Sequence, residues 1–308
     1  MKKAIITGST GLLGMAVTKY LTSMNIEILC IGRRQLTETE VKKNFGSKIN
    51  YISILMKNIS DLDQVIIKNN WKPGNDCVFY NFAWSGVHNL TDGILQDQLN
   101  NATYAEKAVK VAKQIGCVKF INAGTMEETF AEQHLKGRKN IPFFSSQTNY
   151  TISKLAARDM CKISSYLEKI DYIHTRLSLP LAPDLSAGTY VAKNLKNILE
   201  GKNFDPPTND RLFDVIFIDD VAKAYYLIGN YGKNKANYFI GTSKPITLNE
   251  YFNQLKHKIK GTKEKFIEVE EKRTELNLFN IEQLQKDTGF RPSTDLFNLG
   301  LKRKIRIK

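Results

Sequence analysis

The sequence predicts an α/β fold built on a doubly wound parallel sheet, with a smaller C-terminal lobe. Short apolar segments rich in β-branched residues alternate with amphipathic segments through the N-terminal half, which is typical of parallel strands joined by crossover helices. A glycine-rich turn, with Gly8, Gly11 and Gly14 each separated by two residues, follows the first apolar segment and opens the first helical one. After Pro180 the regular alternation stops, and prolines and glycines indicate loops.

Strands are expected where apolar segments are short and bounded by turn residues, at residues 2–8, 26–32, 49–55, 77–83, 118–124 and 171–179. The helical spacing of apolar residues predicts helices at 12–24, 97–116, 149–169 and 190–201. The segment 215–229 is typical of a strand that runs directly into a helix. Gly116 ends the second of these helices in the way a C-terminal cap does.

The composition is that of a globular protein, with 42% hydrophobic and 25% charged residues. No apolar stretch approaches the ~20 residues that span a bilayer. Lys2 and Lys3 before an apolar run imitate a secretory leader, but the run breaks at Thr7 and no small-residue cleavage site follows. Four well-separated cysteines favour reduced, buried thiols in a cytoplasmic protein over a disulfide or metal framework: Cys30, Cys77, Cys117 and Cys161.

The formal net charge of +14 predicts an anionic partner. The basic residues are scattered, apart from the dense cluster LKRKIRIK at 301–308, for which we expect a solvated basic end; a lipid or nucleic-acid contact is the alternative. The chain has no basic patch interleaved with aromatic residues of the kind that binds single-stranded nucleic acid. We therefore expect no nucleic-acid partner and no stable membrane insertion.

The glycine-rich turn has the spacing of a phosphate-binding loop. Gly8 allows the tight turn out of the strand, Gly11 lets backbone amides approach a pyrophosphate, and Gly14 lets the helix lie close to the sheet. The N-terminus of the helix adds partial positive charge. Because alternating strands and helices follow, we interpret this turn as the dinucleotide loop of a Rossmann-type fold, the alternative being a loop that uses glycine only for turning.

The end of the second predicted strand distinguishes between NAD and NADP. An NAD enzyme places a carboxylate there for the ribose 2′-hydroxyl. Here Arg33 and Arg34 follow the strand, and no acidic residue occurs before Glu38. Two guanidinium groups can hold the 2′-phosphate of NADP through charge-assisted, bidentate hydrogen bonds, so the sequence favours NADP(H). Solvated surface arginines are the alternative.

Tyr150 and Lys154 lie four residues apart on a predicted helix, which places a phenol and an ammonium group on one helix face. A phenol with a pKa near 10 is a poor proton donor and acceptor at neutral pH. A neighbouring cation favours the phenolate and brings the pKa of the tyrosine nearer the working range. The spacing on its own is common, and an ordinary exposed helix face is the alternative.

Taken together, these pieces resemble the extended short-chain dehydrogenase/reductase family, of the NAD-dependent epimerase/dehydratase type. The resemblance covers nearly the whole chain and rests on the segments TGSTGLLG, NFAWSGV, FINAGTMEE, YTISK, TRLSLPLAP, FDVIFIDDVAKA and LNLFNIEQLQKDTGFRP, in that order. It implies an NADP-binding Rossmann domain at residues 1–178. The segment 213–232 would return to this domain and form part of it. The residues 179–212 and 233–308 would form the substrate-binding lobe.

The resemblance implies a catalytic hydroxyl residue, tyrosine and lysine, which fall on Thr125, Tyr150 and Lys154. Thr125 would hydrogen-bond the substrate oxygen, Tyr150 would pass a proton, and Lys154 would hold the ribose and lower the pKa of the phenol. The expected cofactor-binding residues are Gly8, Ser9, Thr10, Gly11, Leu12, Leu13, Gly14, Arg33, Arg34, Phe82, Ala83, Trp84, Tyr150, Lys154 and Leu179.

The expected substrate-binding residues are Ser85, Thr125, Met126, Glu127 and Arg211. Arg211 is the candidate for holding a substrate diphosphate. Glu127 and Glu128 are candidates for an additional acid or a partner of a sugar hydroxyl.

Relatives carry an asparagine and a tyrosine–glycine pair where this chain has Leu179, Leu181 and Ala182, so only the backbone of Leu179 and Pro180 is expected at the nicotinamide amide. Asp219 and Asp220 are interpreted as caps of the following helix. The four histidines share no ligand spacing, and we expect no metal site: His88, His134, His174 and His257.

The resemblance leaves three reactions on nucleotide-activated sugars: 4-epimerisation, 4,6-dehydration and reduction of a keto sugar. Dehydratases carry an Asp-Glu pair after the catalytic threonine, and Met126-Glu127 is an incomplete match. The arginine pair favours NADPH as reductant, and AGTMEE is similar to a segment of CDP-abequose synthase-like and dTDP-fucose synthase-like 4-ketoreductases. We therefore expect NADPH-dependent reduction of the C4 keto group of a nucleotide-activated 4-keto-6-deoxy sugar, in the biosynthesis of surface-polysaccharide sugars.

Two alternatives stay open. One is a nucleotide-sugar epimerase that retains its NAD(P), and the other is a non-catalytic NADP-sensing protein. Because relatives often dimerise through a four-helix interface that includes the helix of Tyr150, we also expect a homodimer.

Overall fold

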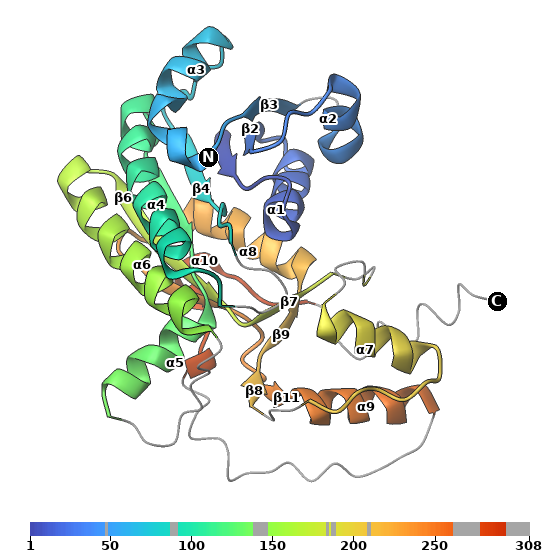
Figure 1. Cartoon of the computed structure of the whole chain (residues 1–308). Coiled ribbons are helices and arrows are strands. Elements are labelled where there is room, and N and C mark those ends of the chain that lie inside the picture. The colour runs from blue at the N-terminus through green and yellow to red at the C-terminus, as the bar shows by residue number, and fades with distance from the viewer. Residues whose placement is uncertain are drawn as a thin grey trace.

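The computed structural model describes residues 1–46, 49–86, 92–137, 147–182, 185, 189–207, 211–260 and 278–293. Its centre is a seven-stranded sheet made of β1 (Lys3–Thr7), β2 (Glu27–Gly32), β3 (Ile49–Ser53), β4 (Val78–Asn81), β5 (Lys119–Ala123), β6 (Asp171–Leu177) and β10 (Asn237–Ile240). The order across the sheet is β10-β6-β5-β4-β1-β2-β3, and every neighbouring pair is parallel (Figure 1).

Helices cover both faces of this sheet, as expected for parallel strands whose side chains are buried on both sides. On one face α1 (Leu12–Ser23) packs along α8 (Ile218–Tyr231), joined by α2 (Glu38–Phe45) and α10 (Glu282–Thr288). On the other lie η1 (Met56–Asp61), α3 (Leu62–Lys68), α4 (Leu95–Ile115) and α6 (Thr148–Glu168). The predicted α/β fold with a doubly wound parallel sheet is confirmed.

The remaining elements form a smaller layer beside the sheet, at the bottom right of Figure 1. It contains β7 (Leu179–Leu181) paired with β9 (Val215–Phe217), β8 (Leu212–Phe213) paired with β11 (Ile246–Thr247), and the helices α7 (Tyr190–Leu199) and α9 (Leu248–Lys260). These elements share an apolar cluster that includes Leu195, Val215 and Phe252.

Two boundaries differ from the sequence prediction. The strand expected at 171–179 ends at Leu177, and Leu179 begins β7. The strand β10 lies at the edge of the central sheet, although it comes from the segment 233–308 that the sequence assigned to the smaller lobe. The division into domains stays a prediction, and the basic cluster at 301–308 lies outside the described residues.

The strand order reverses between β1 and β4, so the chain leaves these two neighbours toward opposite sides of the sheet. Such a point opens a crevice at the carboxyl ends of the strands, where ligands bind in doubly wound folds. Here a row of side-chain hydrogen bonds crosses the strand ends: the Thr7 hydroxyl donates to Asn81 Oδ1 (2.8 Å), and Asn81 Nδ2 donates to Asn122 Oδ1 (2.9 Å). This row fixes the edge from which the loops of the candidate site emerge.

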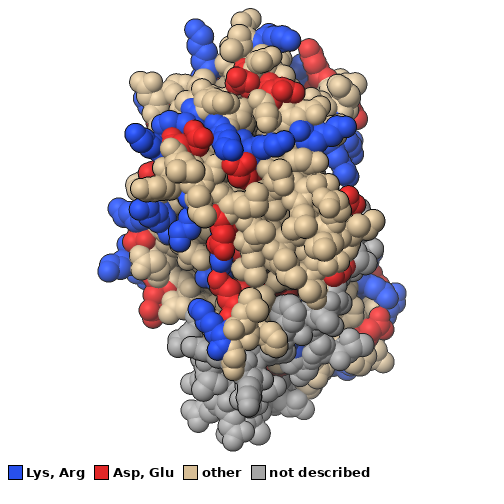
Figure 2. Space-filling model, turned by 60° about the vertical axis from the view of Figure 1, so that its left-hand side comes forward, with Lys and Arg blue, Asp and Glu red and all other residues tan. Residues whose placement is uncertain are grey.

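The face formed by α4 and α6 includes a broad area without charged side chains, beside lysine, arginine and acidic side chains (Figure 2). On α6 the exposed apolar side chains recur on one side of the helix, at Ile152, Met160, Ile163 and Leu167. None of the described helices is long and apolar enough to cross a membrane.

Candidate active site

The glycine-rich loop lies against the backbone that leaves β4. Gly8 has a positive φ of 66°, and a Cβ added there would lie 2.8 Å from the Ala83 nitrogen and 2.9 Å from the Phe82 carbonyl carbon. A Cβ on Gly14 would lie 2.3 Å from the Gly8 carbonyl oxygen. The structure therefore requires glycine at both positions, for the close approach of β1, α1 and the end of β4 that the sequence predicted.

The N-terminus of α1 is open toward the crevice. Gly11 is the N-cap residue and, having no side chain, caps none of the amides of the first helical turn. These amides have no partner inside the helix and supply the partial positive charge that binds phosphate groups. Ser9 is fully buried, and its hydroxyl donates to the Ile31 carbonyl (3.1 Å), so its side chain ties the loop to β2.

Arg33 and Arg34 directly follow β2, next to the loop after β1. Both are exposed, and within the described part of the chain neither side chain has a hydrogen bond or an ion pair. Their backbone carbonyls accept hydrogen bonds from side chains of β3: Tyr51 donates to Arg34 (2.7 Å) and Ser53 to Arg33 (3.4 Å). The backbone is thus held while both guanidinium groups are available to an anion.

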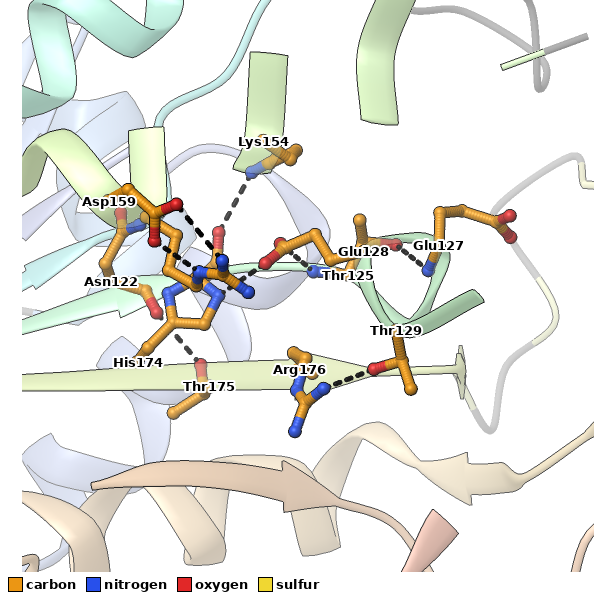
Figure 3. A network of polar contacts seen from close by, with 12 residues as sticks. Asn122, Thr125, Glu127, Glu128, Thr129, Lys154, Asp159, His174, Thr175 and Arg176 are labelled. Carbon is orange, nitrogen blue, oxygen red and sulfur yellow. Dashed lines mark hydrogen bonds and ion pairs between the residues drawn. The ribbon is translucent and has the colours of Figure 1, made fainter. Parts of the chain in front are cut away.

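The structure brings Thr125, Tyr150 and Lys154 together at the carboxyl end of β5. Thr125 is the N-cap residue of α5 (Met126–Leu135), and its hydroxyl accepts from the Glu127 amide (3.4 Å). Lys154 is buried, and its ammonium group donates to the carbonyl of Ala123 (2.9 Å; Figure 3).

Burial and the charge of Glu128 raise the pKa of the Tyr150 phenol above its ordinary value, and hydrogen bonding to Thr125 offsets only part of this rise. Burial also lowers the pKa of Lys154 to about 8, against the opposing effect of Glu128. The sequence argument expected Lys154 to lower the pKa of the phenol. In this site the desolvation of Tyr150 and the nearby carboxylate dominate, so the phenol is favoured over the phenolate.

Trp84 contacts two of the catalytic candidates, Lys154 and Tyr150, in addition to lying at the expected cofactor groove. Its ring lies 3.8 Å from the Lys154 ammonium and meets the Tyr150 ring edge-on, with 6.0 Å between the ring centroids. Its indole nitrogen donates to Gln98 Oε1 (2.7 Å), and Asn101 Nδ2 donates to the Ser85 carbonyl (2.9 Å). Two amide side chains of α4 thus hold Trp84 and Ser85 in place, which no motif in the sequence indicated.

Arg211 and Glu127 form an ion pair across the site, with two hydrogen bonds of 2.6 and 3.1 Å from the guanidinium to the carboxylate. The guanidinium also lies near the rings of Phe130 (5.3 Å) and Phe213 (4.4 Å). Glu127, a candidate for an additional acid or a partner of a sugar hydroxyl, is therefore paired and almost fully buried. Glu128 is completely buried against His174, so it is no partner for a sugar hydroxyl.

The other expected residues lie around the same crevice. Phe82 and Ala83 follow β4 beside Gly8, Met126 is buried at the start of α5, and Leu179 begins β7, partly exposed. Thr10, Leu12 and Leu13 belong to the glycine-rich loop and the first turn of α1. Among the described residues, no cluster of histidine, cysteine and acidic side chains is arranged to hold a metal ion.

With this geometry in view, comparison with known proteins identifies the family. The model of the NAD dependent epimerase/dehydratase family matches residues 4–241, from β1 to just beyond β10, including the loop and the three catalytic candidates. The chain belongs to this family. Its members are enzymes, and the resemblance found in the sequence is confirmed at this level, while the 4-ketoreductase subtype stays a proposal.

Two curated relatives show how broad the family is. The chain is 25% identical over 316 residues to a putative UDP-glucose 4-epimerase of Methanocaldococcus jannaschii, covering 98% of this chain and 96% of the relative. It is 24% identical over 265 residues to a 2-alkyl-3-oxoalkanoate reductase of Shewanella oneidensis, covering 82% of this chain and 65% of that protein.

Solved structures share the fold over the whole chain. The UDP-glucose 4-epimerase of Thermotoga maritima, solved with UDP-glucose, superposes with a TM-score of 0.69 at 14% identity and covers 99% of both chains. The Bordetella bronchiseptica enzyme WbmF, solved with NAD+ and UDP, has a TM-score of 0.71 at 16% identity, covering 99% of this chain and 91% of that one.

Replacing Gly8 with alanine tests the loop. Gly8→Ala is expected to lose more stability than Gly74→Ala, which shares the positive φ but has no atom within 4 Å of the added Cβ. Both variants incur roughly 1–2 kcal/mol for the left-handed backbone, and only Gly8→Ala also collides with the backbone after β4. Urea denaturation measures the loss in free energy of unfolding, and NADPH titration measures the effect on cofactor binding. Equal stability and equal NADPH affinity in the two variants would refute the close packing of Gly8 against the backbone after β4.

Proposed function

We propose that this protein is an NADPH-dependent reductase of the C4 keto group of a nucleotide-activated 4-keto-6-deoxy sugar. The observation that carries the proposal is the pair Arg33 and Arg34, exposed and available at the end of β2 where an NAD enzyme needs a carboxylate. A 2′-phosphate there would take charge-assisted hydrogen bonds from both guanidinium groups. Because NADPH is the usual reductant of biosynthesis, this preference supports reduction as the net reaction.

The residues present fit a nicotinamide dinucleotide. Gly8 and Gly14 allow β1, α1 and the end of β4 to pack closely, while a Cβ on Gly11 would meet only the Gly8 carbonyl oxygen, at 3.3 Å. The first turn of α1 presents amides with no side-chain cap to a pyrophosphate. Lys154 lies at the carboxyl end of β5, where we propose that it holds the ribose. When bound, such a cofactor supplies the hydride for a carbonyl carbon.

The catalytic group provides the proton and holds the oxygen. The Tyr150 phenol, kept protonated by burial and by Glu128, would give its proton to the developing alkoxide. The Thr125 hydroxyl, which interacts with Tyr150, would hydrogen-bond the same oxygen and stabilise its charge. Reduction needs a tyrosine acid at the start, and this site favours the acid.

The residues after Thr125 argue against dehydration. A dehydratase needs an acid and a base at the two positions that follow the threonine, according to the family resemblance. Met126 carries no proton, and Glu127 is neutralised by two hydrogen bonds from Arg211. Neither side chain is suited to remove water from a sugar.

Epimerisation is the second candidate, because the Methanocaldococcus jannaschii relative is described as a putative UDP-glucose 4-epimerase. An epimerase begins by oxidising a hydroxyl, which requires a tyrosine base. It would keep its cofactor through purification and consume no net NADPH. A non-catalytic NADP sensor would need no grouping of Thr125, Tyr150 and Lys154.

We also propose a nucleotide-diphosphate sugar as substrate. The Thermotoga maritima neighbour was solved with UDP-glucose. Arg211 would turn from Glu127 toward the diphosphate when substrate binds, and Ser85 and Thr125 would face the sugar. The exposed apolar side of α6 supports a homodimer. The four cysteines are free and buried, as is typical of proteins of the cytoplasm, and this supports a cytoplasmic location.

The reaction is tested by following NADPH oxidation with dTDP-, CDP-, GDP- and UDP-4-keto-6-deoxy sugars. One nucleotide is expected to give rapid oxidation, and Tyr150→Phe is expected to lose at least ~100-fold in kcat/KM because the proton donor is gone. Tyr166→Phe, on the same helix and 72% exposed, is the matched control and should keep full activity. Nearly full turnover in Tyr150→Phe would overturn the proposal.

The cofactor preference is tested with the double variant Arg33→Ala/Arg34→Ala. Loss of two charge-assisted hydrogen bonds is expected to weaken NADPH binding by about 10- to 100-fold and to leave NADH binding unchanged. The control Lys42→Ala/Lys43→Ala removes the same charge from the nearby α2. A similar loss for NADPH in both double variants would show a general effect of charge and contradict a 2′-phosphate site.

A further inference from the structure

A buried ion pair that the proposed mechanism does not use lies directly behind the catalytic threonine. Glu128 is 0% exposed and His174, on β6, is 2% exposed, with 2.8 Å between Glu128 Oε2 and His174 Nε2 (Figure 3). The other carboxylate oxygen of Glu128 accepts a hydrogen bond from the Thr125 amide (2.8 Å). A buried charged pair is costly to desolvate, so its position beside the site needs an explanation.

Gly124 makes room for this pair. A Cβ added to Gly124 would lie 2.3 Å from Glu128 Oε1 and 2.3 Å from His174 Nε2. Because Gly124 has no Cβ, the Glu128 carboxylate and the His174 imidazole have room to meet at the end of β5. The Gly124 amide donates to the Thr175 carbonyl (2.6 Å), which holds this turn against β6.

Further hydrogen bonds surround the pair. The Tyr172 hydroxyl donates to the Arg158 carbonyl (3.2 Å) and lies 3.3 Å from His174 Nδ1. His174 Nε2 and Glu128 share one proton. Burial alone would raise the pKa of Glu128, but His174, the Thr125 amide and Lys154 together hold it below its usual value. Glu128 is therefore a carboxylate, and it accepts the hydrogen bond from His174 Nε2.

We propose that the Glu128–His174 pair is a positioning element of the catalytic site, which fixes the backbone of Thr125 and holds a buried carboxylate beside the Thr125–Tyr150 group that supplies the proton. Because it concerns the proton that Tyr150 gives, this inference rests on the proposed reduction. Glu128 and His174 touch no substrate in it; they act through Thr125 and Tyr150.

Other charged and titratable groups also face the pair and the phenol. On α5 these are Glu127 and Glu132, on α6 Lys154 and Arg158, on β6 Tyr172 and Arg176, and before α4 Asp92, whose carboxylate accepts from the Tyr150 amide. Glu128 combines a hydrogen bond from its carboxylate to the Thr125 amide with the larger carboxylate effect on the pKa of Tyr150. The carboxylate of Glu127 raises that pKa less, and only its backbone amide bonds to Thr125.

Two substitutions separate the charge of Glu128 from its hydrogen bond. Glu128→Gln keeps an acceptor for the Thr125 amide and removes the charge, so kcat at the pH optimum should stay within about threefold of the parent. Glu128→Leu removes both, so kcat should fall by about 10- to 100-fold through misplacement of Thr125. Because Glu128 also supports the charged form of Lys154, NADPH affinity is compared at about pH 6, below the pKa of Lys154. It should change little there, since neither variant touches the dinucleotide loop.

The pH profile tests the charge. Reduction needs protonated Tyr150, so kcat/KM falls as pH rises through the pKa of the phenol. Removing a nearby negative charge lowers that pKa, so the alkaline limb of Glu128→Gln should lie at lower pH than that of the parent. The control Glu132→Gln, one turn along the same helix and paired with Arg158, should leave the limb in place.

Lys154 also titrates on the alkaline side, so the pH profile alone does not identify Tyr150 as the group that changes. Carbon NMR of labelled tyrosine in the NADP+ complex follows the titration of the Tyr150 phenol directly. Its resonance is the one that is missing in Tyr150→Phe. The Tyr150 resonance should titrate at lower pH in Glu128→Gln than in the parent. This measurement needs no sugar substrate. An unchanged Tyr150 titration, or an equal shift in Glu132→Gln, would overturn the inference.

Nitrogen NMR of the unaltered protein provides a test that survives misfolding of a variant. Nε2 of His174 should carry the proton that it donates to Glu128, and an unprotonated Nε2 would overturn the inference. Failure of the proposed function is a separate result: it is shown by an active Tyr150→Phe. If Tyr150→Phe is inactive while the Glu128 variants behave like the parent, only this inference fails.

Discussion

The site depends on the hydrogen bonds that join the carboxyl ends of the parallel strands. Thr7, Asn81 and Asn122 link β1, β4 and β5, and the Thr175 hydroxyl on β6 extends the row by donating to the Asn122 carbonyl (3.2 Å). Polar side chains buried at these positions must be paired, so a shift of one strand would leave several groups unsatisfied. The row sets the separation of the loops that carry Gly8, Trp84 and Thr125, and hence the width of the crevice.

On this frame the electrostatics of the site favour one protonation state. Burial lowers the pKa of Lys154, while burial and Glu128 raise the pKa of Tyr150, so the neutral phenol is stabilised in the protein. A proton donor of this kind suits the formation of an alcohol from a ketone. The paired state of Glu127 and Arg211 removes a second acid from the site. Both observations support reduction over dehydration.

The fold could be predicted because its evidence is local. Apolar strands and the glycine spacing identify the sheet and its loop, and the spacing of Tyr150 and Lys154 identifies the helix that carries them. The sequence did not indicate α5, because its N-terminal capping box at Thr125 lies within a segment interpreted only for chemistry. Nor did it indicate that Glu128 meets His174 or that Glu127 meets Arg211, since these partners are 46 and 84 residues apart and only the tertiary fold joins them. Long-range side-chain pairs leave no periodic pattern in a sequence.

The central claim is that this site delivers hydride and proton to a sugar ketone. The most direct measurement is the fate of deuterium when the protein reduces a nucleotide-activated 4-keto-6-deoxy sugar with NADPH that carries deuterium at both hydrogens of nicotinamide C4. The account predicts one deuterium at C4 of the product sugar, seen by proton NMR, together with one equivalent of NADP+. Unreduced keto sugar with no NADP+ formed would contradict the account. If the protein also interconverts the two C4 configurations of a nucleotide-activated sugar that already carries a C4 hydroxyl, with no net change in the cofactor, epimerisation is established.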